Sequence, residues 1–368
     1  MIVREPMIAE ALVLVGDRHF ERRSIPIPDI GEFDGLLKVE ACGLCGTDHE
    51  QYTGHLRAPF SFIPGHEVVG TIERLGDAAA QRWGVRQGQR VAVEVFHSCR
   101  ECQQCRSGTY RRCERNGFAR MVGFIDVERP PGLWGGYSTH LYLPPDSMLL
   151  PVPDDLNPVL AVLFNPLGAG VRWASTLPDT SPGDVVAVLG PGIRGLSATV
   201  AAREAGAGFV MLTGVGPRDR PRLEQASAFG ADLAIDITEQ DPVAALRTAT
   251  GGLADIVIDV TAKAPAAFAQ AIALTRPGGT VVVAGTRGTL DTPGFSPDQI
   301  VYKEIRILGA LGVDVTAYST ALQILSSRKY PFETIPRRVA GLDDLESLIM
   351  TMAGEGDPKI PVHGVLVP

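Results

Sequence analysis

The chain has 368 residues, of which 45% are hydrophobic and 21% charged, so it can form two domains with cores of their own, and intrinsic disorder is disfavoured. Its net charge of −8 argues against a nucleic-acid-binding surface. No apolar stretch approaches the roughly 20 residues that span a bilayer, and residues 1–6 lack the layout of a signal peptide. We expect a cytoplasmic protein without nucleic-acid or membrane partners, in which six cysteines favour metal binding over disulfides.

Residues 1–150 are predicted to be rich in β-strands. Short apolar runs are separated by Gly and Pro, and sustained helical periodicity is lacking. The runs with the clearest strand pattern are 12–15, 36–40, 68–75, 90–95 and 137–143. This pattern is typical of a compact, partly open β-barrel whose loops carry the functional groups.

Within this region lies the possible site formed by Cys45, His66 and Glu67. A thiol, an imidazole and a neighbouring carboxylate can hold a catalytic zinc ion. Considered alone, however, a single Cys and a single His are more often ordinary packing residues. Cys42 forms a Cys-x2-Cys pair with Cys45, but we interpret it as a small residue buried at the end of a strand.

The most specific motif is a lobe at about residues 96–116 that holds four cysteines. The ligands Cys99, Cys102, Cys105 and Cys113 have the Cys-x2-Cys spacing that lets two sulfurs of a tight turn reach one ion. Four thiolates leave no open position for a substrate, so we expect a structural zinc ion that cross-links the lobe. A zinc-ribbon-like nucleic-acid module is the rival, and the acidic net charge weighs against it.

From about residue 166 the pattern changes to alternating strands and helices. The apolar run 185–189 leads into Gly190-Pro-Gly192-Ile193-Arg-Gly195 and then an Ala-rich helix, which is the required setting for a dinucleotide-binding G-x-G-x-x-G loop. Further strands are expected at 209–213, 233–236, 256–260, 280–284 and 305–309, with helices such as 222–229, 242–250 and 265–275 between them. Six parallel strands covered by helices form a Rossmann domain.

The second strand does not end in the acidic residue that usually binds the ribose of NAD. After Thr213 the chain reads Gly-Val-Gly-Pro-Arg218-Asp219-Arg220. Arg218 or Arg220 could bind the 2′-phosphate of NADP. Asp219 could instead bind the ribose of NAD if the loop folds back. Both arginines could also be solvated loop residues without a role in binding. The cofactor is therefore predicted only as NAD(P).

The rest of the chain is predicted to return to the first domain. Helices at 316–327 and 342–352 and a strand at 363–367 follow the last strand of the parallel sheet. We therefore expect an α/β protein with a discontinuous catalytic domain at 1–165 and 311–368, and a doubly wound parallel sheet domain at 166–310.

Together, these motifs resemble the medium-chain, zinc-dependent alcohol dehydrogenases, including the sorbitol and threonine dehydrogenase branches. The likeness rests on Gly43-Leu-Cys45-Gly-Thr47-Asp48, Gly65-His66-Glu67, the four-cysteine lobe and the glycine loop, and it runs from about residue 11 to residue 367. It implies a GroES-like β-barrel catalytic domain, a Rossmann domain, and a homodimer or homotetramer. The cofactor-binding residues that it implies are Gly190, Gly192, Ile193, Gly195, Thr213, Arg218 and Gly285.

The resemblance also assigns roles around the catalytic zinc. Cys45 and His66 would bind the metal, Glu67 could approach it, and Thr47 would begin a proton relay. The third protein ligand of relatives is a Cys or an acid, but Asn165 stands at the matching position, and a neutral amide is a poor zinc ligand. The relay histidine five residues after the cysteine is replaced by Glu50; His49, one residue earlier, either substitutes for it or is a loop histidine.

The expected reaction interconverts a small alcohol with an aldehyde or ketone, using one catalytic zinc ion, one structural zinc ion and NAD(P). One alternative is a zinc-independent NADPH reductase of an activated double bond on the same scaffold, favoured only by Asn165. A second alternative is a non-catalytic dinucleotide-binding protein.

Overall fold

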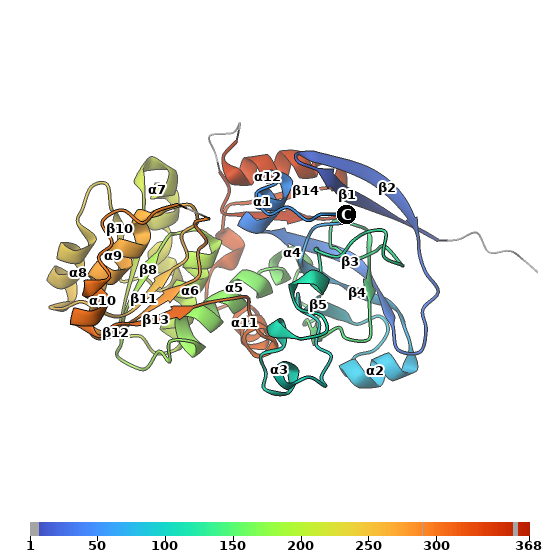
Figure 1. Ribbon diagram of the computed structural model, residues 1–368, viewed down its shortest axis with the longest axis horizontal. Coiled ribbons are helices and arrows are strands. Elements are labelled where there is room, and N and C mark those ends of the chain that lie inside the picture. The colour runs from blue at the N-terminus through green and yellow to red at the C-terminus, as the bar shows by residue number, and fades with distance from the viewer. Residues whose placement is uncertain (1–6, 289, 356–359) are drawn as a thin grey trace, which may run out of the picture. The chain divides into compact units, whose positions relative to one another are not determined.

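The computed structural model describes residues 7–288, 290–355 and 360–368, and the chain divides into two compact units (Figure 1). Unit 1 comprises Met1–Phe164 and Glu333–Pro368, and unit 2 comprises Asn165–Phe332. Residues 1–6, in which the sequence indicated no signal peptide, lie outside the described residues. No described helix combines the length and the hydrophobicity that a membrane crossing requires.

Unit 1 contains a seven-stranded sheet and a two-stranded hairpin. The hairpin pairs β1 (Ile8–Gly16) with β2 (His19–Pro26). The larger sheet has the order β14-β15-β3-β4-β5-β7, and β6 pairs with β3. Its strands are β3 (Gly35–Leu44), β4 (Glu67–Leu75), β5 (Arg90–Val93), β6 (His140–Leu143), β7 (Leu149–Pro151), β14 (Arg337–Ala340) and β15 (His363–Leu366). All five strand runs singled out in the sequence overlap one of these strands, whereas β2 is mostly polar and gave no apolar run.

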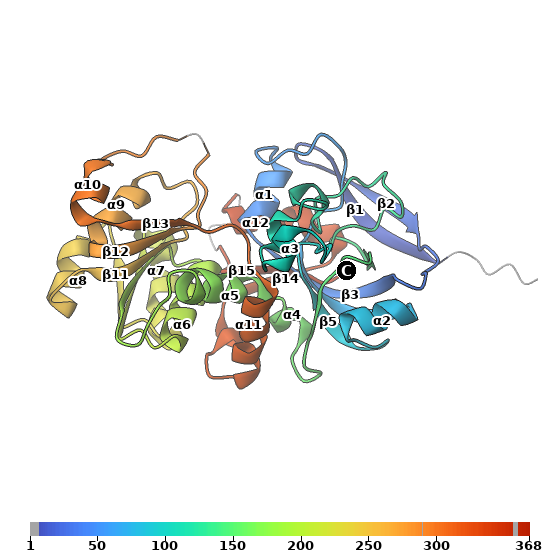
Figure 2. The same cartoon turned by 60° about the horizontal axis from the view of Figure 1, so that its bottom comes forward.

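Short helices connect the strands of unit 1. They are α1 (Gly46–Tyr52), α2 (Asp77–Trp83), α3 (Gln103–Arg106), α4 (Pro158–Ala161) and α12 (Leu345–Ala353), with 3-10 turns at Tyr110–Arg112, Phe118–Arg120 and Leu342–Asp344. Helix α12 places Leu345, Leu348 and Ile349 at helical spacing, and these side chains join the core beside strand residues such as Val68. Figure 2 shows α12, β14 and β15 among the N-terminal elements of unit 1, so this unit is formed by two separate segments of the chain.

Unit 2 is built on the predicted sheet of six parallel strands. The order is β10-β9-β8-β11-β12-β13, and every neighbouring pair is parallel. The strands are β8 (Val185–Leu189), β9 (Phe209–Gly214), β10 (Leu233–Asp236), β11 (Ala254–Asp259), β12 (Thr275–Val283) and β13 (Arg306–Gly309). The strand order reverses direction beside β8, which is the point where doubly wound sheets bind nucleotides.

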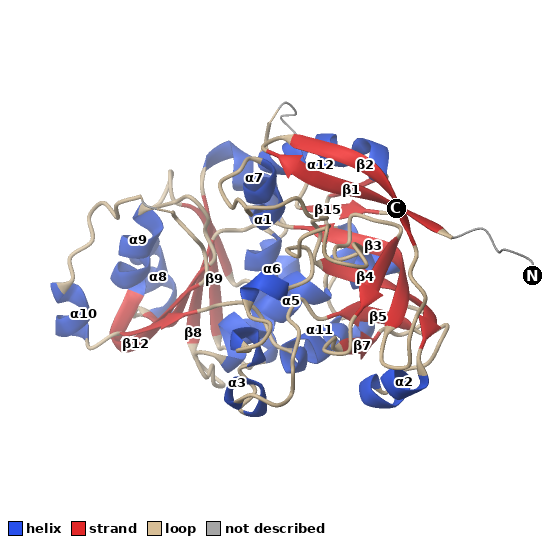
Figure 3. Cartoon of the chain, turned by 45° about the vertical axis from the view of Figure 1, so that its right-hand side comes forward, coloured by secondary structure: helices blue, strands red, loops and turns tan. Residues whose placement is uncertain are grey.

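Helices cover both faces of this sheet. Figure 3 shows α8 and α9 on one side of the strands and α6 on the other. The helices are α5 (Phe164–Val171), which continues as a π-helical turn (Arg172–Thr176), α6 (Ile193–Glu204), α7 (Gly216–Glu224), α8 (Pro242–Thr250), α9 (Ala266–Leu274), α10 (Asp298–Lys303) and α11 (Val315–Ser327); 3-10 turns lie at Ala226–Phe229 and Phe332–Thr334. The helix predicted at 222–229 is instead the end of α7 followed by a 3-10 turn.

The boundary expected at residue 310 requires correction, because residues 311–332 belong to unit 2. Helix α11 packs closely against α5: a Cβ atom on Gly168 would lie 2.4 Å from a ring carbon of Tyr318. Trp173 also donates a hydrogen bond of 3.1 Å to the carbonyl of Gly312. These contacts join residues far apart in the sequence, so local patterns could not indicate them.

Candidate active site and cofactor sites

The pairing of β3 with β4 brings Cys45 and His66 together. Cys45 lies between β3 and α1, and His66 lies directly before β4, whose Glu67 is paired with Gly43. The sulfur of Cys45 is 3.4 Å from Nε2 of His66, and the two atoms and a carboxylate oxygen of Glu67 all lie within 4.8 Å of one another. Glycine at position 43 leaves room for this carboxylate, because a Cβ atom there would lie 2.4 Å from Oε2 of Glu67.

These three residues fit a zinc ion. His66 and Glu67 are 7% and 1% exposed, and Nδ1 of His66 has no hydrogen-bond partner among the described residues. One thiolate, one imidazole and one carboxylate are the ligand types that catalytic zinc sites use, and three protein ligands leave a position for substrate. Cys45, His66 and Glu67 therefore lie together in unit 1, whereas Asn165, the fourth residue weighed as a ligand, belongs to unit 2.

Asp48 supports this site and was not singled out in the sequence. Its Oδ2 accepts a hydrogen bond of 2.8 Å from the backbone N–H of Cys45, and the side chain is 2% exposed. The carboxylate thereby satisfies a free N–H at the start of α1 and orients the loop that carries the thiol. An acid three residues after Cys45, at the N3 position of a capping box, is the signal that could have indicated it.

Cys42 is a packing residue, as interpreted from the sequence. It is fully buried, and a Cβ atom on Gly65 or Gly136 would lie within 3.0 Å of its sulfur. Burial raises the pKa of the Cys42 thiol well above its usual range, so the thiol stays protonated and is a poor metal ligand.

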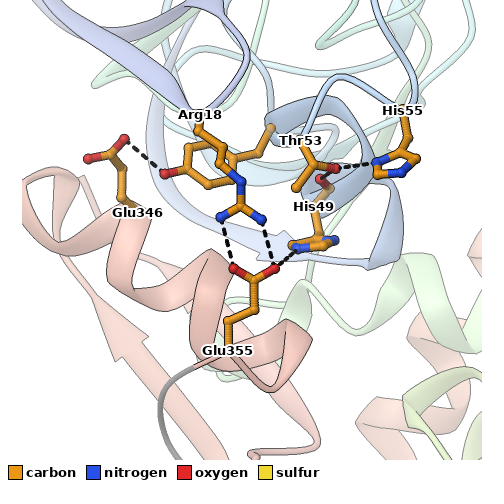
Figure 4. A network of polar contacts seen from close by, with 7 residues as sticks. Arg18, His49, Thr53, His55, Glu346 and Glu355 are labelled. Atoms are coloured by element: carbon orange, nitrogen blue, oxygen red, sulfur yellow. Dashed lines mark hydrogen bonds and ion pairs between the residues drawn. The ribbon is translucent and has the colours of Figure 1, made fainter.

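His49 lies on α1 rather than on a loop, and its ring is bound to Glu355. Nε2 of His49 is 2.8 Å from Oε1 of Glu355, and Arg18 donates two hydrogen bonds, of 2.8 and 3.0 Å, to the same carboxylate (Figure 4). Hydrogen bonds from Arg18 and His49 lower the pKa of Glu355 to about 2. Sequence reasoning could not find this network, because Glu355 is 306 residues away from His49 along the chain.

The four cysteines of the lobe form a second group that could hold a metal ion. Their sulfur atoms all lie within 4.8 Å of one another, and those of Cys99 and Cys105 are 3.7 Å apart. Burial opposes the thiolate of Cys113, but three backbone N–H groups that donate to its sulfur outweigh burial and lower its pKa to about 6. A set of four sulfurs fits a closed, tetrahedral zinc ion and leaves no position for substrate. The group consists of Cys99, Cys102, Cys105 and Cys113.

The glycine loop has the geometry that a dinucleotide requires. Gly190 has a φ of +100°, which only glycine adopts readily, and its N–H donates to the carbonyl of Thr213 at the end of β9. Gly192 precedes α6, which begins at Ile193, so the N–H groups of this helix start directly after the loop. A Cβ atom on Gly195 would lie 1.7 Å from the carbonyl oxygen of Gly190, so close packing of helix and loop needs glycine.

Gly285 follows β12 at the same carboxyl edge of the sheet. A Cβ atom on Gly285 would lie 1.7 Å from the carbonyl oxygen of Thr261, and one on Gly190 would lie 3.1 Å from the methyl group of the same threonine. The loops after β8, β11 and β12 therefore pack against one another, and this edge is where doubly wound sheets bind dinucleotides.

Asp219 lies beside the end of β9 and is hydrogen-bonded within its own loop. The strand ends at Gly214, where a Cβ atom would lie 2.9 Å from the Cβ of Asp219. Asp219 accepts the backbone N–H of Val215 at 3.0 Å and pairs with Arg222 at 3.2 Å, so each of its oxygens already has one partner within the loop. Arg218, in contrast, is exposed, and no described carboxylate pairs with it.

Asn165 begins unit 2, in α5, and its amide is engaged within that unit. The side chain is 3% exposed, and Nδ2 donates a hydrogen bond of 2.9 Å to the hydroxyl of Tyr318 on α11. The amide thus joins α5 to α11, a role that the sequence did not indicate.

Comparisons with known proteins identify the family of the chain. Residues 31–154 match the family model of the alcohol dehydrogenase GroES-like domain, and residues 195–327 match that of the zinc-binding dehydrogenase. The chain is 64% identical over 362 residues to a protein of Mycobacterium tuberculosis named "Probable alcohol dehydrogenase adh", which covers 98% of this chain and 99% of the relative. It is 32% identical to the sorbitol dehydrogenase of Bacillus subtilis, over 88% of this chain and 87% of the relative.

A solved structure shows the same fold with a bound dinucleotide. A zinc-binding dehydrogenase of Sinorhizobium meliloti 1021, crystallised with NADP, is 26% identical and superimposes with a TM-score of 0.83, over 98% of this chain and all of that chain. The metal-binding residues, the glycine loop and these likenesses extend over both units. The chain therefore belongs to the medium-chain, zinc-dependent alcohol dehydrogenases, which interconvert an alcohol and an aldehyde or ketone with NAD(P).

Proposed function

We propose that the alcohol is oxidised at the group formed by Cys45, His66 and Glu67. The observation that carries this proposal is that a thiol, an imidazole and a carboxylate converge to within 4.8 Å at the joined ends of β3 and β4. A zinc ion held by these residues would act as a Lewis acid and lower the pKa of the substrate hydroxyl. Thr47, in the first turn of α1, would accept the hydroxyl proton through its own hydroxyl group.

Glu67, rather than Asn165, is proposed as the third protein ligand of the catalytic zinc. Glu67 already lies beside Cys45 and His66, and its negative charge would balance that of the metal. The amide nitrogen of Asn165 is used by Tyr318, and a neutral amide oxygen is a weak ligand for zinc. We assign Asn165 to holding α5 and α11 together.

The unit-2 glycine loop would bind the dinucleotide. Gly190, Gly192, Ile193 and Gly195 would present backbone N–H groups to the pyrophosphate, with Thr213 and Gly285 at the same edge of the sheet. The nicotinamide of the bound cofactor supplies the hydride acceptor.

We further propose a preference for NADP over NAD. Asp219, the acid that could bind the ribose, is already paired with Arg222 and accepts the N–H of Val215, which makes it a weaker candidate than a free carboxylate. Arg218 and Arg220 are both exposed, but Arg220 is paired with Glu239 at 2.6 Å, so among the described residues Arg218 is the one without a carboxylate partner. A guanidinium group can bind a 2′-phosphate with two hydrogen bonds.

A homo-oligomer is proposed from the exposed edge of the unit-2 sheet. β13 is an edge strand, and Ile307 on it is 38% exposed. Val301 and Tyr302, on the preceding helix α10, are 70% and 75% exposed. Exposed apolar residues beside an open strand edge favour pairing with a second copy. We propose a homodimer or homotetramer that acts in the cytoplasm. The acidic net charge separately disfavours a nucleic-acid partner.

Metal analysis combined with a substrate panel tests the proposed chemistry. Metal-quantified enzyme is assayed with primary alcohols, secondary alcohols and polyols, each with NAD and with NADP. Two zinc ions per chain, one of which is lost together with turnover in Cys45→Ala, support the proposal. Full activity of metal-depleted Cys45→Ala enzyme would contradict it. One zinc ion per chain, together with reduction of activated double bonds, would identify a zinc-independent reductase. Dinucleotide binding without turnover of any alcohol would identify a binding protein.

A further inference from the structure

We propose that Gln51 selects alcohols that carry a second hydroxyl group beyond an apolar spacer, such as a hydroxylated aromatic alcohol. This inference rests on the proposed oxidation of an alcohol at Cys45, His66 and Glu67, and it adds the class of substrate. Two observations carry it. A cavity lies in unit 1, and a buried amide oxygen of its wall has no hydrogen-bond partner among the described residues.

The cavity has a volume of about 380 Å³ and lies between the end of β1 and residues 57–62, in the loop that follows α1. This volume is in the range of small-molecule sites. Apolar side chains form much of the wall, among them those of Leu14, Phe60 and Phe62. Such a wall favours an apolar part of a ligand, for example an aromatic ring.

The charged residues that line the cavity balance each other. They are Arg57 and Asp17, whose side chains are 71% and 53% exposed, and Nε of Arg57 lies 3.9 Å from Oδ1 of Asp17. An exposed ion pair of this kind contributes little to stability, but it leaves no net charge at the rim. The cavity therefore suits a neutral alcohol better than an acid or an amine.

Gln51 supplies the buried polar group of the wall. Its side chain is 2% exposed, and Nε2 donates a hydrogen bond of 3.3 Å to the carbonyl of Gly123. Because a carbonyl oxygen can only accept, this contact fixes the amide nitrogen toward Gly123 and turns the amide oxygen away from it. Oε1 of Gln51 is buried and has no hydrogen-bond partner in the described part of the chain.

The chemistry of this oxygen defines the ligand that it would bind. A buried amide oxygen without a partner is unfavourable, and a donor group of a ligand would satisfy it. Since the oxygen can only accept, a hydroxyl group fits at this place and an ether oxygen does not. An apolar wall with one acceptor thus matches an alcohol in which a hydroxyl group follows an apolar spacer.

Two contacts link the wall of the cavity to the residue His66. Gly123, which holds the amide of the wall, packs against the residue before His66: a Cβ atom on Gly123 would lie 2.8 Å from the carbonyl oxygen of Gly65. The ring of Phe62 stacks on that of Phe124 with centroids 6.0 Å apart, and the ring of Phe124 lies 6.3 Å from that of His66. An alcohol that reacts beside His66 can therefore extend past these rings into the cavity.

The test compares benzyl alcohol, 4-hydroxybenzyl alcohol and 4-methoxybenzyl alcohol. The last two carry electron-donating groups at the same position, but only the phenolic hydroxyl can donate a hydrogen bond. The natural enzyme should oxidise 4-hydroxybenzyl alcohol with a kcat/KM roughly 10-fold or more above that of the other two, because only this alcohol satisfies the buried amide oxygen.

Three variants separate the amide from the rest of the cavity. Gln51→Met keeps a side chain of similar length without the amide, so the kcat/KM ratio of 4-hydroxybenzyl to 4-methoxybenzyl alcohol should fall to about 1. Gln87→Met should leave this ratio unchanged; it is the matched control, because Gln87 also donates to a backbone carbonyl, that of Glu73, but does not line the cavity. Ala58→Trp narrows the cavity at another residue of its wall and should lower the kcat/KM ratio of 4-hydroxybenzyl alcohol to ethanol.

A binding measurement without turnover accompanies the kinetics. The enzyme is prepared without NAD(P), so that no hydride acceptor is present, and the Kd of each aromatic alcohol is determined by saturation-transfer NMR. The natural enzyme should bind 4-hydroxybenzyl alcohol more tightly than 4-methoxybenzyl alcohol, and Gln51→Met should bind the two equally.

The proposal is overturned if the natural enzyme treats the three aromatic alcohols alike. It is also overturned if Gln51→Met has the melting temperature of the natural enzyme and keeps the preference for 4-hydroxybenzyl alcohol. Failure of the proposed function would look different, because the natural enzyme would then oxidise none of the alcohols, while its preference in binding would remain.

Discussion

The amide nitrogen of Asn165 donates a hydrogen bond of 2.9 Å to the hydroxyl of Tyr318, and both side chains are buried. Asn165 stands where relatives suggest a charged metal ligand, yet here it joins two helices of one unit. The residue can therefore be tested as a structural group.

Replacing Asn165 with alanine should destabilise the protein and leave its metal content unchanged. Loss of a buried hydrogen bond costs about 1–3 kcal/mol, so the melting temperature should fall. Zinc per chain is measured together with thermal unfolding, and Asn165→Gln serves as the control that keeps an amide. A fall from two zinc ions to one in Asn165→Ala would assign the amide to the catalytic metal.

Replacing Cys113 with serine should remove the structural zinc and destabilise unit 1. Zinc prefers four thiolates at such a site, and the lobe depends on the ion for cross-linking. Metal content should fall by one ion per chain, and unfolding should begin at a lower temperature. Cys42→Ser is the matched control, because that thiol belongs to neither group of ligands; loss of zinc in this variant would contradict the assignment.

Arg218→Ala should weaken NADP binding and leave NAD binding nearly unchanged. A hydrogen bond to a charged group contributes about 1.5–3 kcal/mol, so the Kd for NADP should rise by roughly 10-fold or more. Binding of NADP, NAD and 2′,5′-ADP is measured by calorimetry. Arg220→Ala is the comparison, since Arg220 is paired with Glu239. If Arg218→Ala weakened the binding of NAD and NADP equally, Arg218 would not bind the 2′-phosphate.

Ile307→Lys should shift the assembly toward smaller species. A charge on the exposed edge strand β13 opposes pairing with a second copy. The molar mass is measured by light scattering over a range of protein concentrations, with Phe33→Lys, an exposed apolar residue of unit 1, as the control. An unchanged mass for Ile307→Lys would place the interface elsewhere.

Acid should destabilise the protein through His363. Burial, followed by the charge of Arg337, lowers the pKa of this histidine to about 3, from an ordinary value of 6.5. Between these pH values the ring of His363 is protonated in the unfolded chain and neutral in the folded chain. The free energy of unfolding therefore falls as the pH drops from about 6.5 to about 3. Urea unfolding at pH 7, 6 and 5 measures the slope. His363→Gln should reduce it but not abolish it, because burial also lowers the pKa of His97 to about 4; an unchanged slope in this variant would contradict the role of His363.

Much of the fold was predictable because its signals are local. The apolar strand 185–189, the glycines that follow it and the helix 242–250 are set by neighbouring residues, and the structure has both elements at those bounds. The position of helix α11 was not predictable, because Tyr318 packs against Gly168, about 150 residues earlier in the chain. Its own periodicity indicates only a helix with an apolar face.

The sequence by itself determined which chemical groups are available: Cys45, His66 and Glu67, the four cysteines of the lobe, and the glycine loop, since their types and spacing carry the chemistry. Only the tertiary structure decided how neighbouring residues divide their roles. The ring of His49 is hydrogen-bonded to Glu355, and the amide of Asn165 donates a hydrogen bond to Tyr318. Both partners come from distant parts of the chain, so a side chain's role there depends on which partner the fold brings to it.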